Sequence, residues 1–360
     1  MEAKKRNKPL KIAGSLWKKY SFVLVFILIL VVYAITISSN GNTFNWGHIS
    51  GILSSQNTVI VGTMALGMGF VIITGQIDLS VGSALVLCSG VTVVVFNITN
   101  NIFLTILAAL GSGLILGSIN GVLVAYAKMP PFIVTLGTML IYRSLALSQV
   151  RAISPDITGS SSSQFALLSD NSSYNFLRMV FGTGSLKIGA FSIPYVTFLF
   201  VAMVIIFVYI SKNTKYGKSV YATGSNEKAT HLVGIKVQRV KFSVFALTGL
   251  LVGVASLIQV CKIGNITPAS SAQAYEMYAI AAVVLGGINM MGGRGNVVGI
   301  LFGALSYTTI NFIIVSIPSL SADIQNTFQG LVLLLVILVQ TAGPAIKEKF
   351  TGRRKVVTQL

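Results

Sequence analysis

Long apolar stretches alternate with short polar intervals along this chain, and the apolar stretches are about 20 residues long. A helix needs about that length of mostly apolar sequence to cross a bilayer, because backbone amides cannot be left unpaired in hydrocarbon. The pattern predicts ten membrane-spanning helices, although the second and third share one stretch that could form a broken helix. They lie at 20–38, 57–74, 80–96, 102–127, 132–150, 191–211, 242–261, 277–291, 297–317 and 324–341.

The basic residues in the polar intervals predict the orientation of these helices. If both termini are cytoplasmic, 21 of the 26 Lys and Arg lie on the cytoplasmic side or in the termini. Only Arg151, Arg178, Lys187 and Lys262 lie outside, and Arg143 falls within the fifth span. Cytoplasmic loops carry such an excess of Lys and Arg. We therefore expect an all-α integral membrane protein with an even number of spans.

The intervals also define the expected domain organisation. A basic cytoplasmic N-terminus (1–19) precedes a single membrane domain (20–345), and a basic cytoplasmic tail (346–360) follows it. The first apolar run could be a signal peptide. We favour an uncleaved helix, because the run has full span length and no small-residue cleavage site closes it. The largest external loop, 151–190, is either a simple connection or a landing surface for an external partner.

Composition agrees with a membrane protein. Of 360 residues, 54% are hydrophobic and 9% are charged, whereas a soluble domain has about a quarter charged residues. The net charge of +18 follows from membrane topology and attraction to anionic lipid, so no nucleic-acid partner is required.

Sequence motifs of intrinsic catalysis are missing. The chain has no GxxxxGK[ST] phosphate loop and no HExxH, CxxC or GxSxG motif. Its two histidines, His48 and His231, lie in different aqueous regions of the predicted topology. Its two cysteines, Cys88 and Cys261, lie in apolar runs and give no metal-ligand spacing. We expect neither an enzyme nor a bound metal or cofactor.

Polar residues set among apolar ones are candidates for a solute path or gate, since a charge in hydrocarbon costs at least about 2.5–3.5 kcal/mol. Asp78 could contact the solute, or Asp78 or Ser80 could cap the third span. Arg143 could snorkel, pair with a carboxylate or line a polar cavity. The candidate path residues are Gln76, Asp78, Arg143, Glu276 and Asn289.

The loop 212–241 is the longest charged interval between two apolar blocks, and it carries seven Lys and Arg. Its centre predicts a short helix with Ser225 or Asn226 as the cap, Glu227 in the first turn and Gly234 at the end. Such a helix is amphipathic through Ala229, Leu232 and Val233, and it could dock into a groove of a soluble partner. Alternatively, the loop could lie against anionic lipid.

Four motifs in order resemble the permease subunits of ribose-type ABC importers, which take up ribose, xylose, galactose and related signal sugars. They read Asp78-Leu-Ser-Val-Gly-Ser83, Pro131-Phe-Ile-Val-Thr-Leu-Gly137, Ala222-x-Gly-x-Asn-Glu-x-Ala229 with Gly234-Ile235, and Tyr275-Glu-x-x-Ala279 through Gly287 with Gly292-Gly-x-Gly295. The resemblance covers about 57–340. Lys228 and Thr230-His231 depart from the usual family pattern.

The resemblance implies a multi-pass protein of the bacterial cytoplasmic membrane that moves a monosaccharide or similar small polar solute. It implies pairing with a second permease copy or paralogue, two ATP-binding cassette subunits that hydrolyse ATP, and an external sugar-binding protein. Within loop 212–241 it implies a coupling helix that docks on the ATPase. The residues carried over for this role are Gly224, Asn226, Glu227, Ala229, His231 and Gly234.

An ion-coupled secondary transporter is the alternative, but such proteins usually need intramembrane charges to bind the coupling ion.

Overall fold

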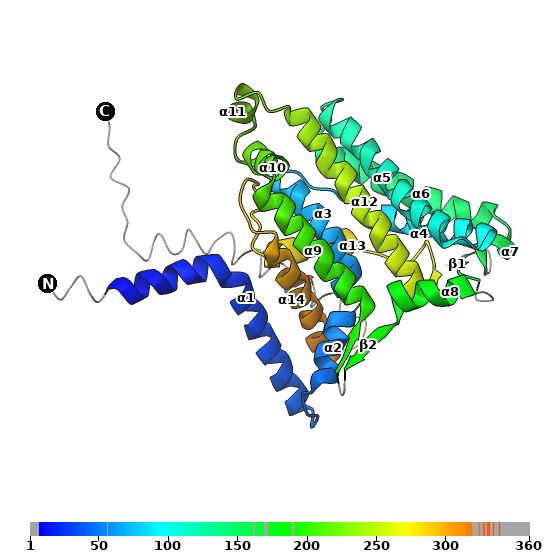
Figure 1. Ribbon diagram of the computed structural model, residues 1–360, viewed down its shortest axis with the longest axis horizontal. Helices are drawn as coiled ribbons and strands as arrows, with labels where there is room; N and C mark the ends of the chain where they lie inside the picture. Colours follow the sequence, from blue (N-terminus) through cyan, green and yellow to red (C-terminus); the bar gives the residue numbers. More distant parts are fainter. Residues whose placement is uncertain are drawn as a thin grey trace.

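The computed structural model describes residues 7–318 except 56, 161–162, 169–171 and 189–190, together with the single positions 324, 327, 330, 331, 334 and 338. The described chain is mostly helical (Figure 1). Its longer helices are α1 (Asn7–Ser39), α3 (Gly62–Ile73), α4 (Val81–Thr99), α5 (Ile102–Ala125), α6 (Pro131–Ala152), α9 (Tyr195–Asn213), α10 (Lys215–Ser225), α12 (Val237–Ile263), α13 (Tyr275–Leu285) and α14 (Val298–Val315). The shorter ones are α2 (Trp46–Ser54), η2 (Asn57–Val61), α7 (Pro155–Thr158), α8 (Ser172–Leu177), η3 (Arg178–Gly182) and α11 (Glu227–Leu232).

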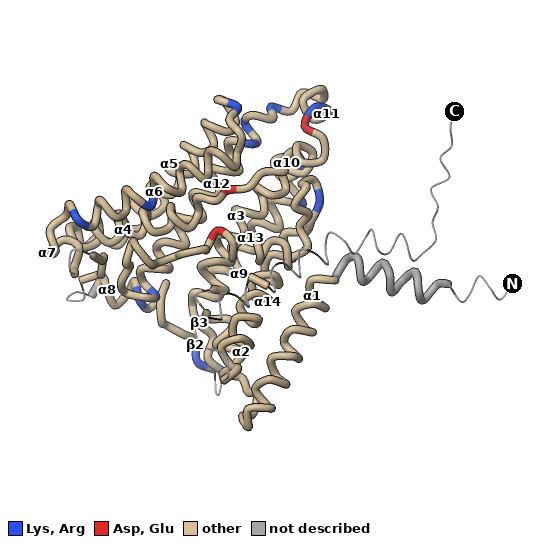
Figure 2. The backbone as a smooth tube through the Cα atoms, turned by 180° about the vertical axis from the view of Figure 1, so that it is seen from behind, with Lys and Arg blue, Asp and Glu red and all other residues tan. Residues whose placement is uncertain are grey.

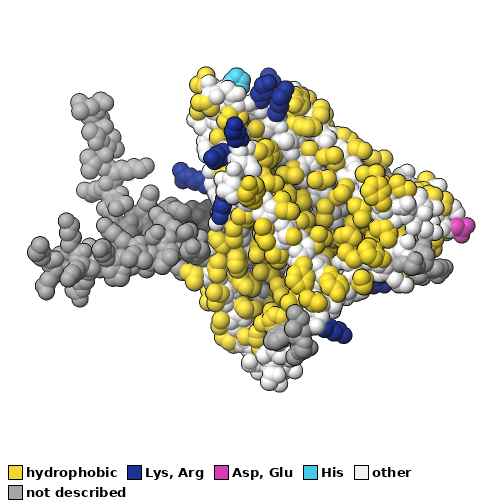
Figure 3. Space-filling view, viewed as in Figure 1, with side chains coloured by type: hydrophobic (Ala, Val, Ile, Leu, Met, Phe, Trp, Pro, Cys, Tyr) yellow, Lys and Arg dark blue, Asp and Glu magenta, His cyan; other side chains and the backbone are white. Residues whose placement is uncertain are grey.

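Seven of the described helices are long and apolar enough to cross a membrane, and α2 with η2–α3 forms a bent pair that brings the number to eight. Their outward side chains are apolar, with Phe103 on α5 72% exposed and Ile205 on α9 63% exposed. A space-filling view shows this apolar surface as a broad band, with Lys and Arg at its edge near α10 and α11 (Figure 3). Exposure of large apolar side chains on this scale suits contact with lipid.

One predicted span differs from the structure, and one open alternative is resolved. The span expected at 277–291 is shorter, because α13 ends at Leu285 and the chain then turns through Gly286 and Gly287, where φ is +79° at Gly287. The second and third spans are separate helices, α3 and α4, joined by residues 74–80 rather than one broken helix. Most of the tenth span expected at 324–341 lies outside the described residues, as does the tail at 346–360.

The centre of the molecule is α3, in which every side chain is buried. Helix α12 packs against α3, α4 and α5, while α13 and α14 cover another side of α3. Figure 1 shows α12 running diagonally across the bundle from α11 to β1. An all-round apolar helix such as α3 is stable only in this enclosed position.

Glycines bring α5 and α12 into backbone contact. Gly113 and Gly117 on α5 face Gly249 and Gly253 on α12. A Cβ atom at Gly249 would overlap the carbonyl oxygen of Gly113 and would lie 2.7 Å from the Cα of Gly117. Small residues four apart allow such close approach of membrane helices.

The helices connect two opposite ends of the molecule. At the end that we call the β end, β1 (Phe165–Ala166) pairs antiparallel with β4 (Asn265–Ile266), and β2 (Ser185–Ile188) pairs with β3 (Phe191–Pro194). These two small sheets are a correction to the expectation of an all-α protein. Strands β1 and β2 lie in the predicted loop 151–190, β3 follows it directly, and β4 comes after α12. The loop is otherwise partly helical through α7, α8 and η3.

The opposite end, which we call the α11 end, contains α10, α11, the start of α12 and the segment 286–297. Lys and Arg gather there, as the backbone coloured by charge shows (Figure 2). Within the described residues this end carries Lys128, Lys212, Lys215, Lys218, Lys228, Lys236, Arg239, Lys241 and Arg294, while the β end carries Arg151, Arg178, Lys187 and Lys262.

Candidate functional site

The predicted short helix exists as α11, and its ends are formed as the sequence predicted. The Oδ1 atom of Asn226 accepts a hydrogen bond from the amide of Ala229 (3.0 Å), which satisfies one of the free amides at the helix start. Glu227 lies in the first turn. Beyond the end of α11, Gly234 has φ +84°, a conformation that favours glycine.

The tip of α11 is apolar and uncovered within the described chain. The side chain of Leu232 is 85% exposed and that of Val233 is 75% exposed. Ala229 and His231 are also exposed, and Thr230 is the buried residue of the helix. Leu232 and Val233 are neighbours at this tip, and together they leave an exposed apolar surface on α11.

Helix α10 anchors α11 to the centre of the bundle through Gly224. A Cβ atom at Gly224 would overlap the carbonyl oxygen of Ile73, the last residue of α3, and would lie 2.7 Å from the amide nitrogen of Gly293. Gly293 donates its own amide hydrogen to the same Ile73 carbonyl (2.8 Å). Three backbone segments therefore meet at one point, with no room for a side chain.

Two side chains of α10 strengthen this junction. The hydroxyl of Tyr221 donates to the carbonyl of Gly295 (3.0 Å), and the hydroxyl of Ser225 donates to the carbonyl of Gly293 (3.3 Å). Burial raises the pKa of the Tyr221 phenol, so that it stays protonated and keeps its role as donor. A movement of α10 must accordingly move segment 292–295 as well.

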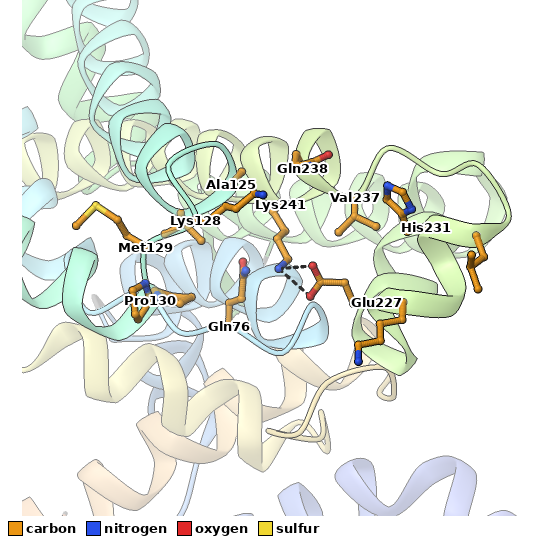
Figure 4. A pocket seen from close by; sticks show the side chains of 14 residues that line it. Gln76, Ala125, Lys128, Met129, Pro130, Glu227, His231, Val237, Gln238 and Lys241 are labelled. Atoms are coloured by element: carbon orange, nitrogen blue, oxygen red, sulfur yellow. Dashed lines mark hydrogen bonds and ion pairs between the residues drawn. The ribbon is translucent and has the colours of Figure 1, made fainter.

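An ion pair joins α11 to α12. The Nζ atom of Lys241 donates to both carboxylate oxygens of Glu227, at 2.9 and 2.8 Å (Figure 4). The Glu227 side chain is 56% exposed and the Lys241 side chain is 18% exposed. Because water screens the pair, it orients α11 more than it stabilises the fold.

A hollow of about 880 Å³ lies between α11, the start of α12 and the turn from α5 to α6. Figure 4 shows Gln76, Lys128, Glu227 and Lys241 directed toward one another across it. The lining residues are Gln76, Val124, Ala125, Lys128, Met129, Pro130, Pro131, Glu227, Lys228, His231, Leu232, Val237, Gln238 and Lys241. The hollow thus joins one path candidate, Gln76, to two coupling candidates, Glu227 and His231.

Asp78 belongs to a buried polar chain beyond Gln76. Its Oδ1 atom accepts hydrogen bonds from the amide (2.9 Å) and the hydroxyl (2.7 Å) of Ser80. Asn120 on α5 donates to the Ser80 hydroxyl (2.8 Å), and the hydroxyl of Tyr142 on α6 donates to the carbonyl of Leu116 (3.0 Å) and reaches Asn120 (3.5 Å). These hydrogen bonds link the segment after α3 to helices α5 and α6.

This arrangement changes the capping role expected for Asp78 or Ser80. Ser80 occupies the position before α4, but its side chain makes no capping hydrogen bond to the helix. Its hydroxyl is instead turned between Asp78 and Asn120. The polar groups satisfy one another, which is what burial of polar atoms requires.

Arg143 binds carbonyl groups rather than an acidic side chain. Its Nη1 atom donates to the carbonyls of Pro268 (2.9 Å) and Ser271 (2.7 Å), and its Nη2 atom donates to that of Ala272 (3.4 Å). Within the described residues the sole ion pair is Glu227 with Lys241. Arg143 thus fastens α6 to the segment that leads into α13, where Glu276 is half-buried beside Gly82.

Asn289 is separate from all of these groups. Its Oδ1 atom accepts from the amide of Met291 (2.9 Å), and its amide donates to the carbonyl of Arg294 (3.1 Å). It shapes its own turn and is exposed. The five path candidates therefore do not form one site: Gln76 lines the hollow, Asp78 lies in the buried polar network, Arg143 binds the segment before α13, Glu276 lies in the first turn of α13, and Asn289 lies in the 289–294 turn.

Comparison with known proteins identifies the class of molecule to which this geometry belongs. A family model described as the permease component of branched-chain amino acid transport systems matches residues 50–337. The chain belongs to this permease family. It is a multi-pass membrane protein and a subunit of a transport system, related to permeases of the bacterial cytoplasmic membrane.

Individual relatives are similar to the chain along almost its whole length. The ribose import permease protein RbsC of Haemophilus influenzae is 36% identical over 96% of this chain and 97% of its own length. RbsC of Escherichia coli is 34% identical over 90% and 94%, and the xylose transport system permease protein XylH of Haemophilus influenzae is 30% identical over 89% and 96%. No solved structure matches the chain. The resemblance to ribose-type permeases is confirmed.

Several residues of these sites were not singled out in the sequence. Asn120 and Tyr142 interrupt apolar stretches and could have been noticed for that reason. Lys241 and Tyr221 look like ordinary residues of a basic loop, and nothing in their local sequence predicts their partners. Their importance comes from contacts made across the fold.

Proposed function

We propose that this chain is the membrane-spanning subunit of an ATP-driven importer for a monosaccharide, and that α11 is its coupling helix. Two copies, or this chain and a paralogue, would form the pathway over two ATP-binding cassette subunits, and an external sugar-binding protein would deliver the solute. The observation that carries the proposal is the uncovered apolar tip of α11 on a helix fixed by backbone contact to α3.

The relatives support a sugar rather than an amino acid as the solute. The family description mentions branched-chain amino acids, but RbsC and XylH, which match nearly the whole chain, are named for ribose import and xylose transport. A monosaccharide needs hydrogen-bonding groups and no charged anchors along its path. The interior polar groups, such as Asn120, Tyr142 and Ser80, fit such a solute.

The charge distribution supports a cytoplasmic α11 end. The described Lys and Arg are concentrated there (Figure 2), and cytoplasmic segments carry this excess. With the short helix α13, the bent α2–α3 pair and a tenth span at 324–341, ten crossings would bring both termini to the same side. The exposed tip of α11 would then face the soluble ATPase.

ATP binding would bring the two ATPase subunits together and displace α11. Because Gly224, Ile73 and Gly293 are in contact, α3 and segment 292–295 would follow. The polar chain from Asp78 to Tyr142 would then pass the displacement to α5 and α6. The two states of the pathway would differ in these contacts, and the ATPase would supply the free energy.

The test replaces the apolar tip without disturbing the fold. In vesicles containing the full chain with its ATPase subunits, we expect Leu232→Asp to reduce both sugar uptake and the binding of ATPase by at least about tenfold, since it puts a charge into an apolar contact. Met291→Asp is the matched control, because Met291 is equally exposed (85%) at the same end. Unchanged uptake by Leu232→Asp, or equal loss in both variants, would refute the role of α11.

The same vesicles test the class of transporter. Uptake must require ATP and the ATPase subunits. If the chain alone accumulated sugar in response to an ion gradient, the importer proposal would be wrong and the secondary transporter would be right.

A further inference from the structure

The hollow beneath α11 collects positive charge from three separate elements. Lys128 comes from the α5–α6 turn, Lys228 from α11 and Lys241 from α12, and all three line the hollow. Glu227 is the one carboxylate among the lining residues. Lys241 uses two hydrogen bonds on Glu227, and an ammonium group has three donors, so one remains.

The position of Lys128 is fixed by its backbone. Lys128 has φ +57°, in the left-handed region that is unfavourable for a residue with a side chain. The turn is held on both sides, because the amides of Ala127 and Met129 donate to the carbonyls of Val122 and Leu123, each at 3.1 Å. Pro130 and Pro131 then start α6. The backbone of Lys128 is therefore already ordered, and only its exposed side chain has to be ordered when a ligand binds.

Two long helices also begin at this hollow. The first residues of α6 (Pro131) and of α12 (Val237 and Gln238) line it, and neither helix start has a side-chain cap. A helix start carries a partial positive charge and free amide donors, which favour an anion.

Gln76 adds an uncharged donor to the hollow. Its side chain is 7% exposed, and Figure 4 shows its amide directed into the hollow between Lys128 and Lys241. Its amide oxygen makes one long hydrogen bond, with the Thr74 hydroxyl at 3.5 Å, and its amide nitrogen has no hydrogen-bond partner within the described chain. The nitrogen is not among the fully buried polar atoms that lack a partner, so it opens onto the hollow and can donate to a ligand or water there.

We propose that this hollow binds the phosphate group of an anionic organic ligand through Lys128, Lys241 and the Gln76 amide, with Lys228 at its rim. The volume of about 880 Å³ exceeds the need of a bare ion, and Val124, Ala125, Met129 and Val237 add an apolar wall. The group therefore belongs to an organic phosphate, either a free phosphorylated metabolite or a phospholipid headgroup. Charge-assisted hydrogen bonds from lysine suit phosphate oxygens.

Binding would tie α11 to the α5–α6 turn and to α12. Because α11 is the proposed coupling helix, a bound phosphate would restrain its movement and slow transport. This consequence for transport rests on the proposed function, whereas the binding itself does not.

The first experiment titrates the purified full-length chain in neutral detergent with inorganic phosphate at constant ionic strength and follows the temperature of unfolding. A ligand that binds the folded chain raises this temperature. We expect Lys128→Ala to weaken the apparent affinity roughly tenfold. Lys128→Arg keeps the charge and should keep most of the affinity. Lys218→Ala, an exposed lysine of α10 outside the hollow, is the control and should bind as wild type.

The second experiment distinguishes the two sources. Native mass spectrometry counts phosphatidylglycerol retained by the chain from mixed phosphatidylglycerol and phosphatidylcholine. Retention that depends on Lys128, without stabilisation by inorganic phosphate, identifies a headgroup; stabilisation by phosphate without lipid retention identifies a soluble ligand. The proposal is overturned if neither depends on Lys128, or if Lys218→Ala has the same effect.

Discussion

The α5–α12 interface and the junction of α10 with α3 both depend on glycine, but they serve different parts of the molecule. At the first, four glycines let two long helices touch along the buried centre. At the second, Gly224 lets the end of a solvent-facing helix touch the last carbonyl of α3. The first contact holds the bundle together, and the second joins the bundle to a tip that nothing in the described chain covers.

The difference shows how a membrane protein separates stability from movement. Helices α5 and α12 meet along several turns, so no part of that contact can shift alone. The α10 junction is smaller: Gly224 meets Ile73, Tyr221 and Ser225 add two hydrogen bonds, and Tyr216 of α10 stacks on Phe70 of α3. We propose that α10 and α11 move together there, because packed cores resist continuous deformation whereas a small contact between rigid pieces shifts more readily.

The largest expected effect is at the interior interface. Gly249→Leu forces a side chain against the backbone of Gly113 and Gly117, so we expect a loss of about 3 kcal/mol or more of unfolding free energy. Thermal unfolding in detergent measures it. Gly111→Ala on α5, outside the contact with α12, is the control, because a Cβ at Gly111 meets nothing within 4 Å. Equal stability of both variants would show that α5 and α12 are not in backbone contact.

The next effect concerns the α10 junction. Gly224→Ala places a methyl group against the Ile73 carbonyl, and we expect a smaller loss of about 1–3 kcal/mol, since α10 can tilt away from α3. Sugar uptake should fall by a larger fraction than the unfolding free energy, because the tilt removes the contact through which α10 and α3 would move together. Coupled uptake and ATP hydrolysis are the measurements, with Gly51→Ala, which meets nothing within 4 Å, as control. If the Gly224→Ala protein is folded and takes up sugar at the full rate, then Gly224 has no role in coupling.

The features of these two regions that could be predicted are those that depend on residues close together in the sequence. The cap at Asn226 and the end of α11 near Gly234 depend on neighbouring residues, and both were predicted. The apolar runs likewise located the long helices, because the bilayer requires them. The family motifs added the expectation of a permease, which the relatives confirm.

Contacts between distant segments were not predictable in this way. Gly224 meets Ile73 and Gly293, and Ser80 meets Asn120, only because helices far apart in sequence pack together. Arg143 illustrates the same limit: it was expected to snorkel, to pair with a carboxylate or to line a polar cavity, and it binds main-chain carbonyls of the segment before α13. Short β pairs such as Phe165 with Ile266 also depend on tertiary position.

A smaller effect is expected at the cap of α11. Asn226→Ala removes the acceptor for the Ala229 amide and should cost about 1 kcal/mol locally. Hydrogen exchange of α11 amides should rise about fivefold, while exchange in α12 stays unchanged. Asn226→Asp keeps an acceptor and should restore protection. If Asn226→Ala also loosened α12, then α11 would be part of the core and could not act as a separate lever.

The smallest effect is expected at the ion pair between α11 and α12. A double-mutant cycle of Glu227→Ala and Lys241→Ala should give a coupling energy of about 0.2–1 kcal/mol, because the Glu227 carboxylate is 56% exposed. The energy should fall as salt is raised, since exposed charges are screened. If the pair orients α11, then each single variant lowers the rate of sugar uptake clearly while its unfolding temperature stays close to that of the wild type. A coupling energy above about 3 kcal/mol, insensitive to salt, would instead mean that α11 is locked to α12 and moves with the bundle interior.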